Sequence, residues 1–589
     1  SRDNMPMEIL SVTSESARGY VFPLGVAGQF WGASEARQTL VARGCIPSVI
    51  TETWVRNHYR WSVWSAASYA RRFPTRWKEF WSVEAILNRM LYRYEREYTR
   101  GGRSALRMIF EGDASAKQLM VLCVASICAK EGSFGVEVTD GWYSIRSSID
   151  PILAQAIRNG RLREGDKIAC AGLRVEGLSE GIPPLSGKAG DALLFITGNS
   201  VRRARWHAKL GFQYKRTMFM SLSGIYELGG PVGATIDVII VRSYPMLYME
   251  MTTGGQKVIR TEKEELKVAL VFEEKKAALL QSLLGRRRQN EECARRSSSA
   301  ASSVKILDAS CMDGEILYNS IISTNAEPAD AQNMLSDDQR EALERYIVLK
   351  QDEDQAAVNE AVEKTMPSRQ VHALFKLSLC DYPTHTYKSV ETNASRTAVV
   401  TMWRPQNMTP SDFKEGSRFL MSGLTVSVSS DRRRYLQDLA ELRDQRQTEG
   451  HVQLNFSPST SCLKPMDAAP DLVFQSEYRE RSVLHMDELR HLETGQEVDV
   501  TGNVESCSPC EAGYATSICL SGSDECGRTY HATIEFNSAT FGGISLDIGK
   551  QVVVRNCWFV SPRPGDGNRH SFILRAEPFT EIASHGCEK

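Results

Sequence analysis

Basic and aromatic residues lie close together in two stretches of the carboxy-terminal half of this 589-residue chain. Single-stranded nucleic acid is bound by Lys and Arg that follow the phosphates and by aromatic rings that stack on bases, at about 1–3 kcal/mol per base. The residues that we predict for such a surface are Lys376, Trp403, Arg404, Lys414 and Arg418 in one stretch, and Arg481, Arg555, Trp558 and Arg569 in the other. Trp403 fits a core position equally well, and Trp558, inside an apolar run, fits a core position better.

A second group of basic and aromatic residues lies near the amino terminus. Tryptophans are dense there, and we expect most of them to pack in a helical core. A few could instead line a groove for a partner peptide, and the arginines beside them favour an acidic partner. The residues predicted for this surface are Arg60, Trp61, Arg71, Arg72 and Lys78.

The fourteen cysteines show one spacing that is typical of a metal site. Four thiolates could complete a tetrahedral zinc site, and the candidates are Cys507, Cys510, Cys519 and Cys526. Strand alternation argues against their convergence, so we predict free thiols, no bound metal and no cofactor. The scattering of the other cysteines indicates a reducing compartment.

Enzyme motifs are missing from the sequence. The stretch from Gly181 to Lys188 is similar to a phosphate-binding loop, but it has five residues between its glycines and an alanine where a magnesium-binding hydroxyl is needed. No His-Glu-x-x-His motif occurs. We therefore predict that the chain is not an enzyme.

Composition limits the possible partners. The net charge of −1 creates no global field for nucleic acid, so any such site must be a local patch. No apolar run approaches the length of a membrane helix, and we expect no membrane partner. At this length the chain should form several domains.

The hydrophobic pattern predicts helices first and barrels afterwards. Ile50, Trp54, Trp61 and Trp64 recur at helical spacing, and Ala114 to Cys128 is also predicted to be helical. Val136 and Val138 alternate with Glu137, as in a half-buried strand, and Pro151 to Arg158 has the pattern of a short helix. The apolar run Ile236 to Val241 fits a strand buried on both sides. A small five-stranded barrel, closed by that run, is typical of the OB fold.

Two long charged segments predict a helical stalk within the second barrel. Glu262 to Arg288 and Ser336 to Met366 each carry a narrow apolar seam, and the second begins with a capping-box pattern at Ser336. Two such helices are expected to pair antiparallel. The predicted seam residues are Leu266, Leu270, Ala277, Leu280 and Leu284 on the first helix, and Leu343, Ile347, Val358 and Val362 on the second.

Several motifs resemble, in order and rough spacing, the carboxy-terminal DNA-binding region of the breast cancer type 2 susceptibility protein family, the mediators of homologous recombination. Each motif alone is weak, but the set is specific and covers nearly the whole chain. The motifs are Asn57-His-Tyr-Arg-Trp61, Val121-Leu-Cys-Val124, Asp140-Gly-Trp-Tyr143, Trp403-Arg-Pro405 and Ser523-Asp-Glu-Cys526.

The resemblance implies a multi-domain α+β architecture with an all-α domain, three OB-fold barrels and a helical tower inserted in the second barrel. The expected boundaries are 1–130 for the helical domain, 131–246 for the first barrel, 247–471 for the second with its tower at about 260–366, and 472–589 for the third.

The resemblance also implies a function in the nucleus. The chain would be the single-stranded-DNA-binding module of a mediator that helps to load a RecA-family recombinase in double-strand-break repair, with the main recombinase contact outside this chain. Lys376, Trp403 and Arg404 match positions at or near the family's DNA groove. Arg205 and Trp206 match a first-barrel motif near the family's small acidic partner, the split-hand/split-foot protein.

Two alternatives fit the sequence. A protein-interaction scaffold would bind the small acidic partner and would have no DNA grip of its own. A general single-strand coat protein related to replication protein A would explain the barrels, but it would not explain the stalk.

Overall fold

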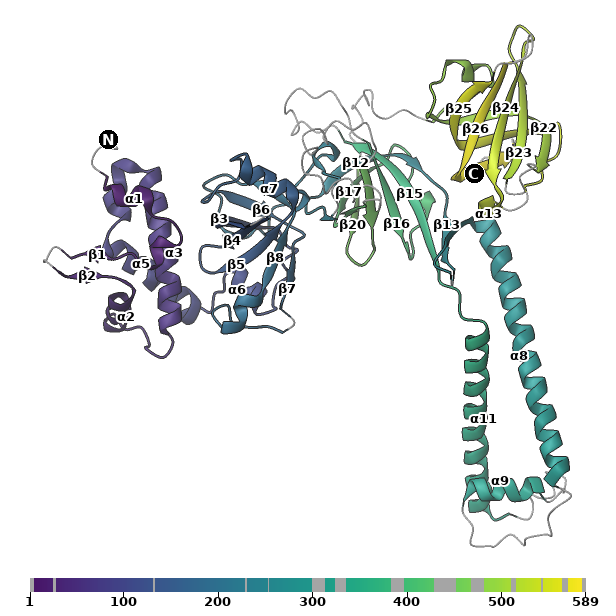
Figure 1. Ribbon diagram of the computed structural model, residues 1–589, viewed down its shortest axis with the longest axis horizontal. Coiled ribbons are helices and arrows are strands. Elements are labelled where there is room, and N and C mark those ends of the chain that lie inside the picture. Colours follow the sequence, from purple (N-terminus) through teal and green to yellow (C-terminus); the bar gives the residue numbers. More distant parts are fainter. Residues whose placement is uncertain are drawn as a thin grey trace. The chain divides into compact units, whose positions relative to one another are not determined.

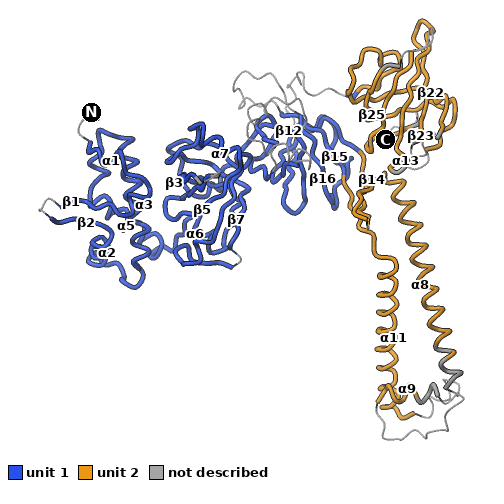
Figure 2. The backbone as a smooth tube through the Cα atoms, in the orientation of Figure 1, with its two compact units in different colours: residues 1–244, 375–481 blue, residues 245–374, 482–589 orange. Residues whose placement is uncertain are grey.

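The chain forms two compact units in a computed structural model, residues 1–244 with 375–481 and residues 245–374 with 482–589 (Figures 1 and 2). Among the described helices, none is both long and apolar enough to cross a membrane. The structure describes all residues except 1–4, 25–27, 131–132, 179, 228–229, 253, 299–312, 324–334, 383–396, 428–451, 468–480, 510–514, 542–543, 564–569 and 585–589.

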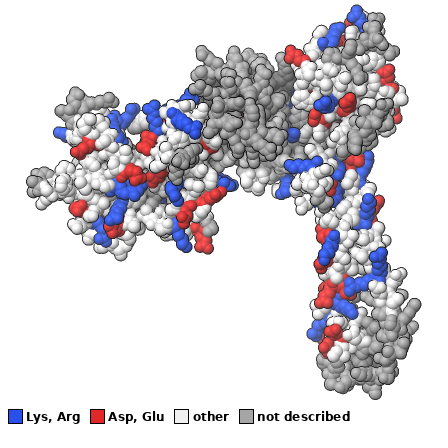
Figure 3. Space-filling view, in the orientation of Figure 1, with Lys and Arg blue, Asp and Glu red and all other residues white. Residues whose placement is uncertain are grey.

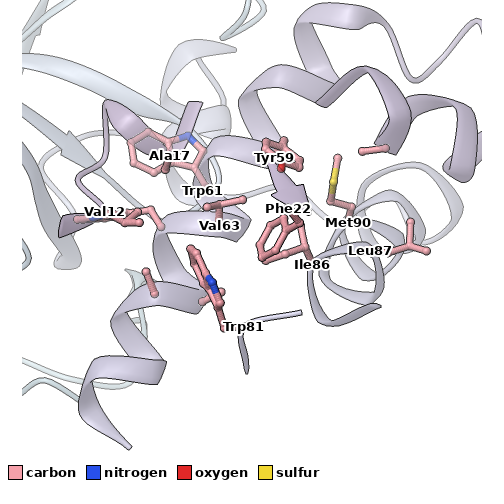
Figure 4. Close-up of a cluster of buried hydrophobic side chains, with 14 of the residues drawn as sticks. Val12, Ala17, Phe22, Tyr59, Trp61, Val63, Trp81, Ile86, Leu87 and Met90 are labelled. Atoms are coloured by element: carbon pink, nitrogen blue, oxygen red, sulfur yellow. The ribbon is translucent and has the colours of Figure 1, made fainter. Parts of the chain in front are cut away.

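The first unit begins with a helical domain organised around α3 (Glu52–Arg72). Thr51 begins this helix by accepting a hydrogen bond from the Trp54 amide, which satisfies one of the unpaired amides of the first turn. The predicted core positions are confirmed, because Ile50, Trp54, Trp61 and Trp64 are all buried. Figure 4 shows Trp61 within this core, together with Tyr59, Val63 and Trp81. The other elements are α1 (Met7–Ser11), α2 (Ala33–Ala42), α4 (Trp77–Phe80), α5 (Val83–Tyr94), α6 (Ala105–Phe110), β1 (Phe22–Pro23) and β2 (Phe30–Trp31).

The first barrel follows as a sheet with the strand order β7-β8-β5-β4-β3-β6-β9. Val136 and Val138 are buried, as predicted, and the predicted helix is α7 (Pro151–Arg158). Asp150 caps α7 by accepting a hydrogen bond from the Leu153 amide at 2.9 Å. The strands are β3 (Met120–Lys130), β4 (Ser133–Thr139), β5 (Ser144–Ile149), β6 (Lys167–Cys170), β7 (Arg174–Glu176), β8 (Leu193–Ile196), β9 (Val201–Arg203) and β10 (Gly211–Phe212), which pairs with β3.

The prediction of a helix from Ala114 to Cys128 is wrong, because β3 occupies most of it. Leu122 and Val124 face the barrel core, whereas Cys123 and Ala125 pack in the core of the helical domain. A strand buried on both faces gives a continuous apolar run that periodicity cannot distinguish from a buried helix. We propose that the first barrel therefore begins before β3 rather than at residue 131.

The prediction that Ile236 to Val241 closes the first barrel is also wrong. This run is β12 (Ile236–Ser243), and it pairs with β15 and β17 of the second barrel. The sheet order is β11-β18-β19-β16-β15-β12-β17-β20. The strands are β11 (Gly230–Pro231), β15 (Val371–Asp381), β16 (Thr397–Trp403), β17 (Arg418–Ser422), β18 (Thr425–Val426), β19 (Val452–Phe456) and β20 (Cys462–Met466).

Strand β15 is buried on both faces over part of its length. Phe375, Leu377 and Leu379 are buried, as the alternation predicts. Cys380 is also buried, because it packs with Ile239 and Tyr382 in a second apolar cluster. The predicted helical insertion at residues 431–447 lies outside the described residues.

The second unit contains two long helices, α8 (Glu262–Ser298) and α11 (Asp337–Thr365), which we call the stalk. The stalk grows from a hairpin of β13 (Leu247–Met251) and β14 (Lys257–Thr261), and α9 (Gly314–Ser323) packs against α11. The predicted capping box at Ser336 is confirmed. Lys, Arg, Asp and Glu are mixed along the stalk on the face shown in Figure 3.

The predicted apolar seam is correct for α11 and wrong for part of α8. Leu343, Val358 and Val362 are buried. Leu266 and Leu270 are about two-thirds exposed. Ion pairs join the two helices instead at Arg287–Asp354 and Lys276–Glu363.

Four charged side chains form ion pairs at the base of the stalk. Arg369 donates to both oxygens of Glu250 at 2.7 and 3.0 Å and also pairs with Glu265 at 2.8 Å. Arg260 pairs with the same two carboxylates. The hydrogen bonds from Arg369 lower the pKa of Glu250 to about 2, so Glu250 stays charged at neutral pH.

The third barrel is closed, because β22 pairs with both β23 and β25. Its core contains Val500, Ile518, Leu520, Ile534 and Leu574. The strands are β21 (Val483–Leu484), β22 (Glu497–Pro509), β23 (Ala515–Ser523), β24 (Thr529–Asn537), β25 (Gln551–Arg563) and β26 (His570–Ser584), in the order β21-β22-β23-β24-β26-β25.

Candidate nucleic-acid and partner-binding surfaces

Trp403 and Arg404 lie at the end of β16 in the second barrel. Trp403 is half-buried, and its indole nitrogen donates a hydrogen bond to Asn455 at 3.0 Å, which fixes the ring. Arg404 is exposed and has a φ of 47°, a conformation that non-glycine residues rarely adopt. An aromatic ring that is held in place beside an exposed guanidinium suits a base and its phosphate.

Two other predicted DNA contacts in this unit are engaged by carboxylates. Arg418 donates to both oxygens of Asp237 at 2.8 and 2.6 Å and stacks 3.7 Å from the Tyr382 ring centroid. Arg481 pairs with Glu415 at 2.7 Å. Because these carboxylates already neutralise them, Arg418 and Arg481 stabilise the fold and are poorly suited to phosphate binding. Of the remaining candidates, Lys376 is half-buried and Lys414 is exposed.

The third barrel places Arg555 and Trp558 on its outer surface. The expectation that Trp558 is a core residue is wrong, since it is 37% exposed. A bulge at Asn556, which has a φ of 60°, shifts the alternation and turns Cys557 rather than Trp558 into the core. Trp558 lies opposite Arg575, which is also exposed. Arg569 lies outside the described residues.

A groove of about 960 Å³ lies between the helical domain and the first barrel, within the first unit. Its single acidic lining residue, Asp140, accepts three hydrogen bonds from the amides of Leu106, Trp142 and Tyr143. Basic and aromatic side chains make up much of the rest of the lining: Arg72, Arg93, Arg96, Arg103, Lys167, Lys209, Trp61, Trp64, Tyr69, Tyr92, Trp142, Trp206, Phe212 and Tyr214.

Arg72 and Arg96 are exposed basic residues of this groove, as are Arg103 and Lys209. Arg72 lies 4.7 Å from the ring centroid of Trp206, which is 49% exposed, and Arg96 lies 5.9 Å from that of Trp142. Neither arginine has an ion-pair partner among the described residues, whereas Arg103 pairs with Glu111 and Asp113. The groove therefore offers positive charge and aromatic surface together.

The partner residues predicted from sequence divide into structural and exposed ones. Arg60 is buried and paired with Glu15 and Glu137 at 2.9 and 2.7 Å, and Trp61 is buried beside it. Arg71 donates to the carbonyls of Ile9, Leu10 and Val12. Arg60 and Arg71 therefore stabilise the domain, whereas Trp61, although buried, also lines the groove. Exposed positions are occupied by Arg72, Lys78, Arg205 and Trp206, of which only Arg72 and Trp206 line the groove.

Sequence reasoning missed Tyr92, Arg93 and Arg96 as groove residues. The spacing of Arg93 and Arg96 places them on neighbouring positions of one helical face, which is the signal that could have found them. Trp142 belongs to a motif that the sequence did single out, but its contact with these arginines arises only in the tertiary structure.

A buried carboxylate beneath the groove joins the helical domain to the first barrel. Glu97 accepts hydrogen bonds from the Trp54 indole at 2.9 Å and from the Tyr143 hydroxyl at 2.8 Å. Burial opposes its ionisation, but contact with His58 and these hydrogen bonds outweigh burial and lower the pKa of Glu97. His58 Nε2 lies 3.4 Å from the carboxylate, while His58 Nδ1 accepts a hydrogen bond from Arg93 at 3.1 Å.

Protonation of His58 should weaken this junction in acid. Burial, together with Arg93 and Arg107, lowers the pKa of His58 to about 4, whereas a histidine in an unfolded chain titrates near 6.5. Between these values the unfolded chain binds the proton and the folded chain does not, so stability present above pH 6.5 is lost as the pH falls towards 4. We expect the free energy of unfolding of this region to decrease by roughly 3 kcal/mol across this interval.

Urea unfolding at a series of pH values, followed by tryptophan fluorescence, would measure this dependence. His58→Gln should flatten the curve between pH 6.5 and 4. His207→Gln removes an exposed histidine and should leave the slope as in the unmodified chain. A slope that His58→Gln does not change would assign the acid sensitivity to other groups.

The cysteines proposed from sequence for zinc do not converge. Cys507 packs against the core side of the third barrel, and its thiol donates to the Ile544 carbonyl. Cys519 lies on the outer face, and Cys526 lies in the exposed turn between β23 and β24. Cys510 lies outside the described residues. The described members therefore cannot bind one ion together.

The chain has the architecture of a multi-barrel protein. A helical domain packs on an OB-type barrel, and two further barrel sheets follow. Residues 28–100 match the profile described as "BRCA2, helical". Residues 104–214 match "BRCA2, oligonucleotide/oligosaccharide-binding, domain 1". Residues 28–214 are therefore similar to the helical domain and the first oligonucleotide-binding domain of the BRCA2 family.

Relatives in Arabidopsis thaliana are similar over most of this chain. "Protein BREAST CANCER SUSCEPTIBILITY 2 homolog A" is 26% identical over 522 residues, which are 85% of this chain and 43% of the relative. Homolog B is 26% identical over 79% of this chain and 41% of its own length. The chain thus spans less than half of the length of these relatives.

Similarity to solved structures is weak. "Structure and Conformational Change of a Replication Protein A Heterotrimer Bound to ssDNA" aligns at 14% identity and a TM-score of 0.22, over 37% of this chain and 44% of that one. This superposition is too poor to support a conclusion about function.

Proposed function

We propose that this chain is the single-stranded-DNA-binding module of a homologous-recombination mediator that acts in the nucleus and is not an enzyme. The observation that carries the proposal is the order of domains, in which the family's helical domain and first oligonucleotide-binding barrel are followed by two further barrels. The stalk would correspond to the family's tower. By the same reasoning, the module would help to load a RecA-family recombinase on the single strand.

Two aromatic–basic pairs, of which Trp403 is half-buried and the other three residues are exposed, would contact the DNA. They are Trp403 with Arg404 in the second barrel and Trp558 with Arg555 in the third. Each ring can stack on one base, and each guanidinium can approach a phosphate. DNA binding would therefore show little sequence preference. Phosphate contacts release counterions, and the affinity should therefore fall steeply with salt.

Fluorescence anisotropy of labelled oligo-dT and of a matched duplex, titrated at several salt concentrations, tests this proposal. We expect tighter, salt-sensitive binding to the single strand. Equal affinity for the duplex would contradict the predicted preference for single-stranded DNA. The lack of any binding at low salt would leave a protein-interaction scaffold as the better interpretation.

Trp403→Ala combined with Arg404→Ala should reduce oligo-dT affinity about tenfold, because it removes one stacking ring and one phosphate contact. Trp558→Ala should have an effect of similar size if the third barrel also binds the strand. Arg174→Ala is the control, because this exposed arginine of the first barrel pairs with Glu176 and lies in neither predicted surface. Unchanged affinity in the double variant, with unchanged thermal unfolding, would exclude the second-barrel surface.

We further propose that the groove between the helical domain and the first barrel binds an acidic protein segment. Its arginines that have no ion-pair partner among the described residues favour carboxylates. Its indoles favour aromatic or aliphatic side chains, so we expect acidic and apolar residues to alternate in the bound segment. The small acidic split-hand/split-foot protein, which the family resemblance implies, is the expected occupant. Such binding would coexist with DNA binding, because the DNA surfaces belong to other barrels.

A further inference from the structure

Three side chains with metal-binding chemistry meet on the outer face of the third barrel. Glu505, Cys519 and His531 come from the neighbouring strands β22, β23 and β24. His531 Nδ1 lies 2.7 Å from Glu505 Oε2, and Cys519 Sγ lies 3.5 Å from the same oxygen. One potential ligand atom of each residue lies within 4.8 Å of the other two.

A β-bulge in β22 creates this arrangement. Val504 pairs with Leu520, but the next pair is Ser506 with Cys519, so Glu505 is an extra residue on its strand. The bulge leaves Glu505 beside the Ser506–Cys519 pair and returns Cys507 to the core side. Bulges commonly direct a side chain in this way near functional sites.

We propose that Glu505, Cys519 and His531 bind one divalent cation of borderline softness, with zinc as the expected ion. Thiolate, imidazole and carboxylate are the ligands that zinc takes in proteins, whereas magnesium and calcium prefer oxygen ligands alone. Glu505 is half exposed, so solvent can reach the ion and supply a fourth ligand. This three-residue site differs from the four-cysteine set considered from the sequence, with which it shares only Cys519.

Charge and proton balance favour a divalent ion here. On binding, Cys519 releases its thiol proton to solvent, and His531 binds the ion through Nδ1 with its ring proton on Nε2. One carboxylate and one thiolate then neutralise the two positive charges. Because the ion displaces the thiol proton, affinity should increase with pH.

The hydrogen bonding around the three ligands should limit the affinity for the metal ion. His531 Nε2 is buried and has no hydrogen-bond partner among the described residues. Histidine ligands are usually supported by a hydrogen bond from the second ring nitrogen. We therefore expect weaker binding than at a closed four-ligand structural zinc site.

The test is a titration of the full chain, first freed of metal by a chelator, with cobalt and then with zinc. Thiolate coordination gives cobalt a charge-transfer absorption in the near ultraviolet, which zinc should abolish by displacement. We expect one equivalent of cobalt to produce this band. Cys519→Ser should remove the band, and His531→Gln should weaken binding about tenfold or more. Cys526→Ser is the matched control, because it removes an exposed thiol from the same hairpin and should leave the band unchanged.

Glu505→Gln provides a second variant that keeps the thiol, in case Cys519→Ser disturbs the barrel, and circular dichroism would check the fold of each protein. It should lower the cobalt affinity without removing the band. The proposal is overturned if the unmodified chain gives no thiolate band. A band that persists in Cys519→Ser, or that Cys526→Ser removes, also overturns it. Since none of these readouts uses DNA, a failure of the DNA-binding proposal would not affect the result.

Discussion

Glu97→Ala should lower the free energy of unfolding of the helical domain and first barrel by about 3–5 kcal/mol. The carboxylate is completely buried and accepts hydrogen bonds from Trp54 and Tyr143, which belong to the two parts that it joins. Without it, the Trp54 indole and the Tyr143 hydroxyl lose their acceptor in a dry interior. Each such loss costs about 1–3 kcal/mol.

Urea unfolding of the full chain, followed by tryptophan fluorescence, would detect this loss, because six of the ten tryptophans precede residue 82. Glu95→Ala is the matched control: this glutamate is two residues away, half exposed and paired with Arg100. Exposed pairs of that kind contribute about 0–1 kcal/mol. Glu97→Gln keeps an acceptor of similar size and should cost less than Glu97→Ala. Equal effects of Glu95→Ala and Glu97→Ala would show that the buried carboxylate does not join the two domains.

Elements with a periodic apolar pattern could be predicted from the sequence. The spacing of Ile50, Trp54, Trp61 and Trp64 marks the core face of α3, and the alternation around Glu137 marks β4. Both patterns depend on the spacing of side chains, which local geometry sets. Strands β3 and β12 have continuous apolar runs with both faces covered, and spacing alone does not distinguish such a run from a helix or show which barrel it joins.

The roles of charged and aromatic residues depended on partners that are distant in sequence. Arg418 appeared suited to phosphate, but Asp237, 181 residues earlier, binds both of its donor nitrogens. The apolar run around Trp558 favours a core position, but the bulge at Asn556 shifts the alternation and brings Trp558 to the surface. A composition that favours a binding surface therefore identifies candidates, whereas ion pairs and bulges decide which of them reach solvent.

Charge reversal in the groove should weaken binding of the small acidic split-hand/split-foot protein roughly 30- to 150-fold, which is about 2–3 kcal/mol. The change is Arg72→Glu combined with Arg96→Glu. Both arginines line the groove, both lie over its indoles, and neither has an ion-pair partner among the described residues. Reversal therefore replaces two attractions with two repulsions and should not break an internal ion pair of the described structure.

Isothermal titration calorimetry with the acidic protein, at low and at physiological salt, would measure this effect. Lys78→Glu combined with Lys188→Glu is the control, because it changes the net charge by the same amount at two exposed positions outside the groove. If the groove is the site, the control should lose no more than about twofold, and the difference should shrink at high salt, because screening weakens exposed charge pairs. Equal losses in both double variants would indicate a diffuse attraction to basic residues across the helical domain and the first barrel. Full affinity after groove reversal would place the acidic partner elsewhere on the chain, even if DNA binding is intact.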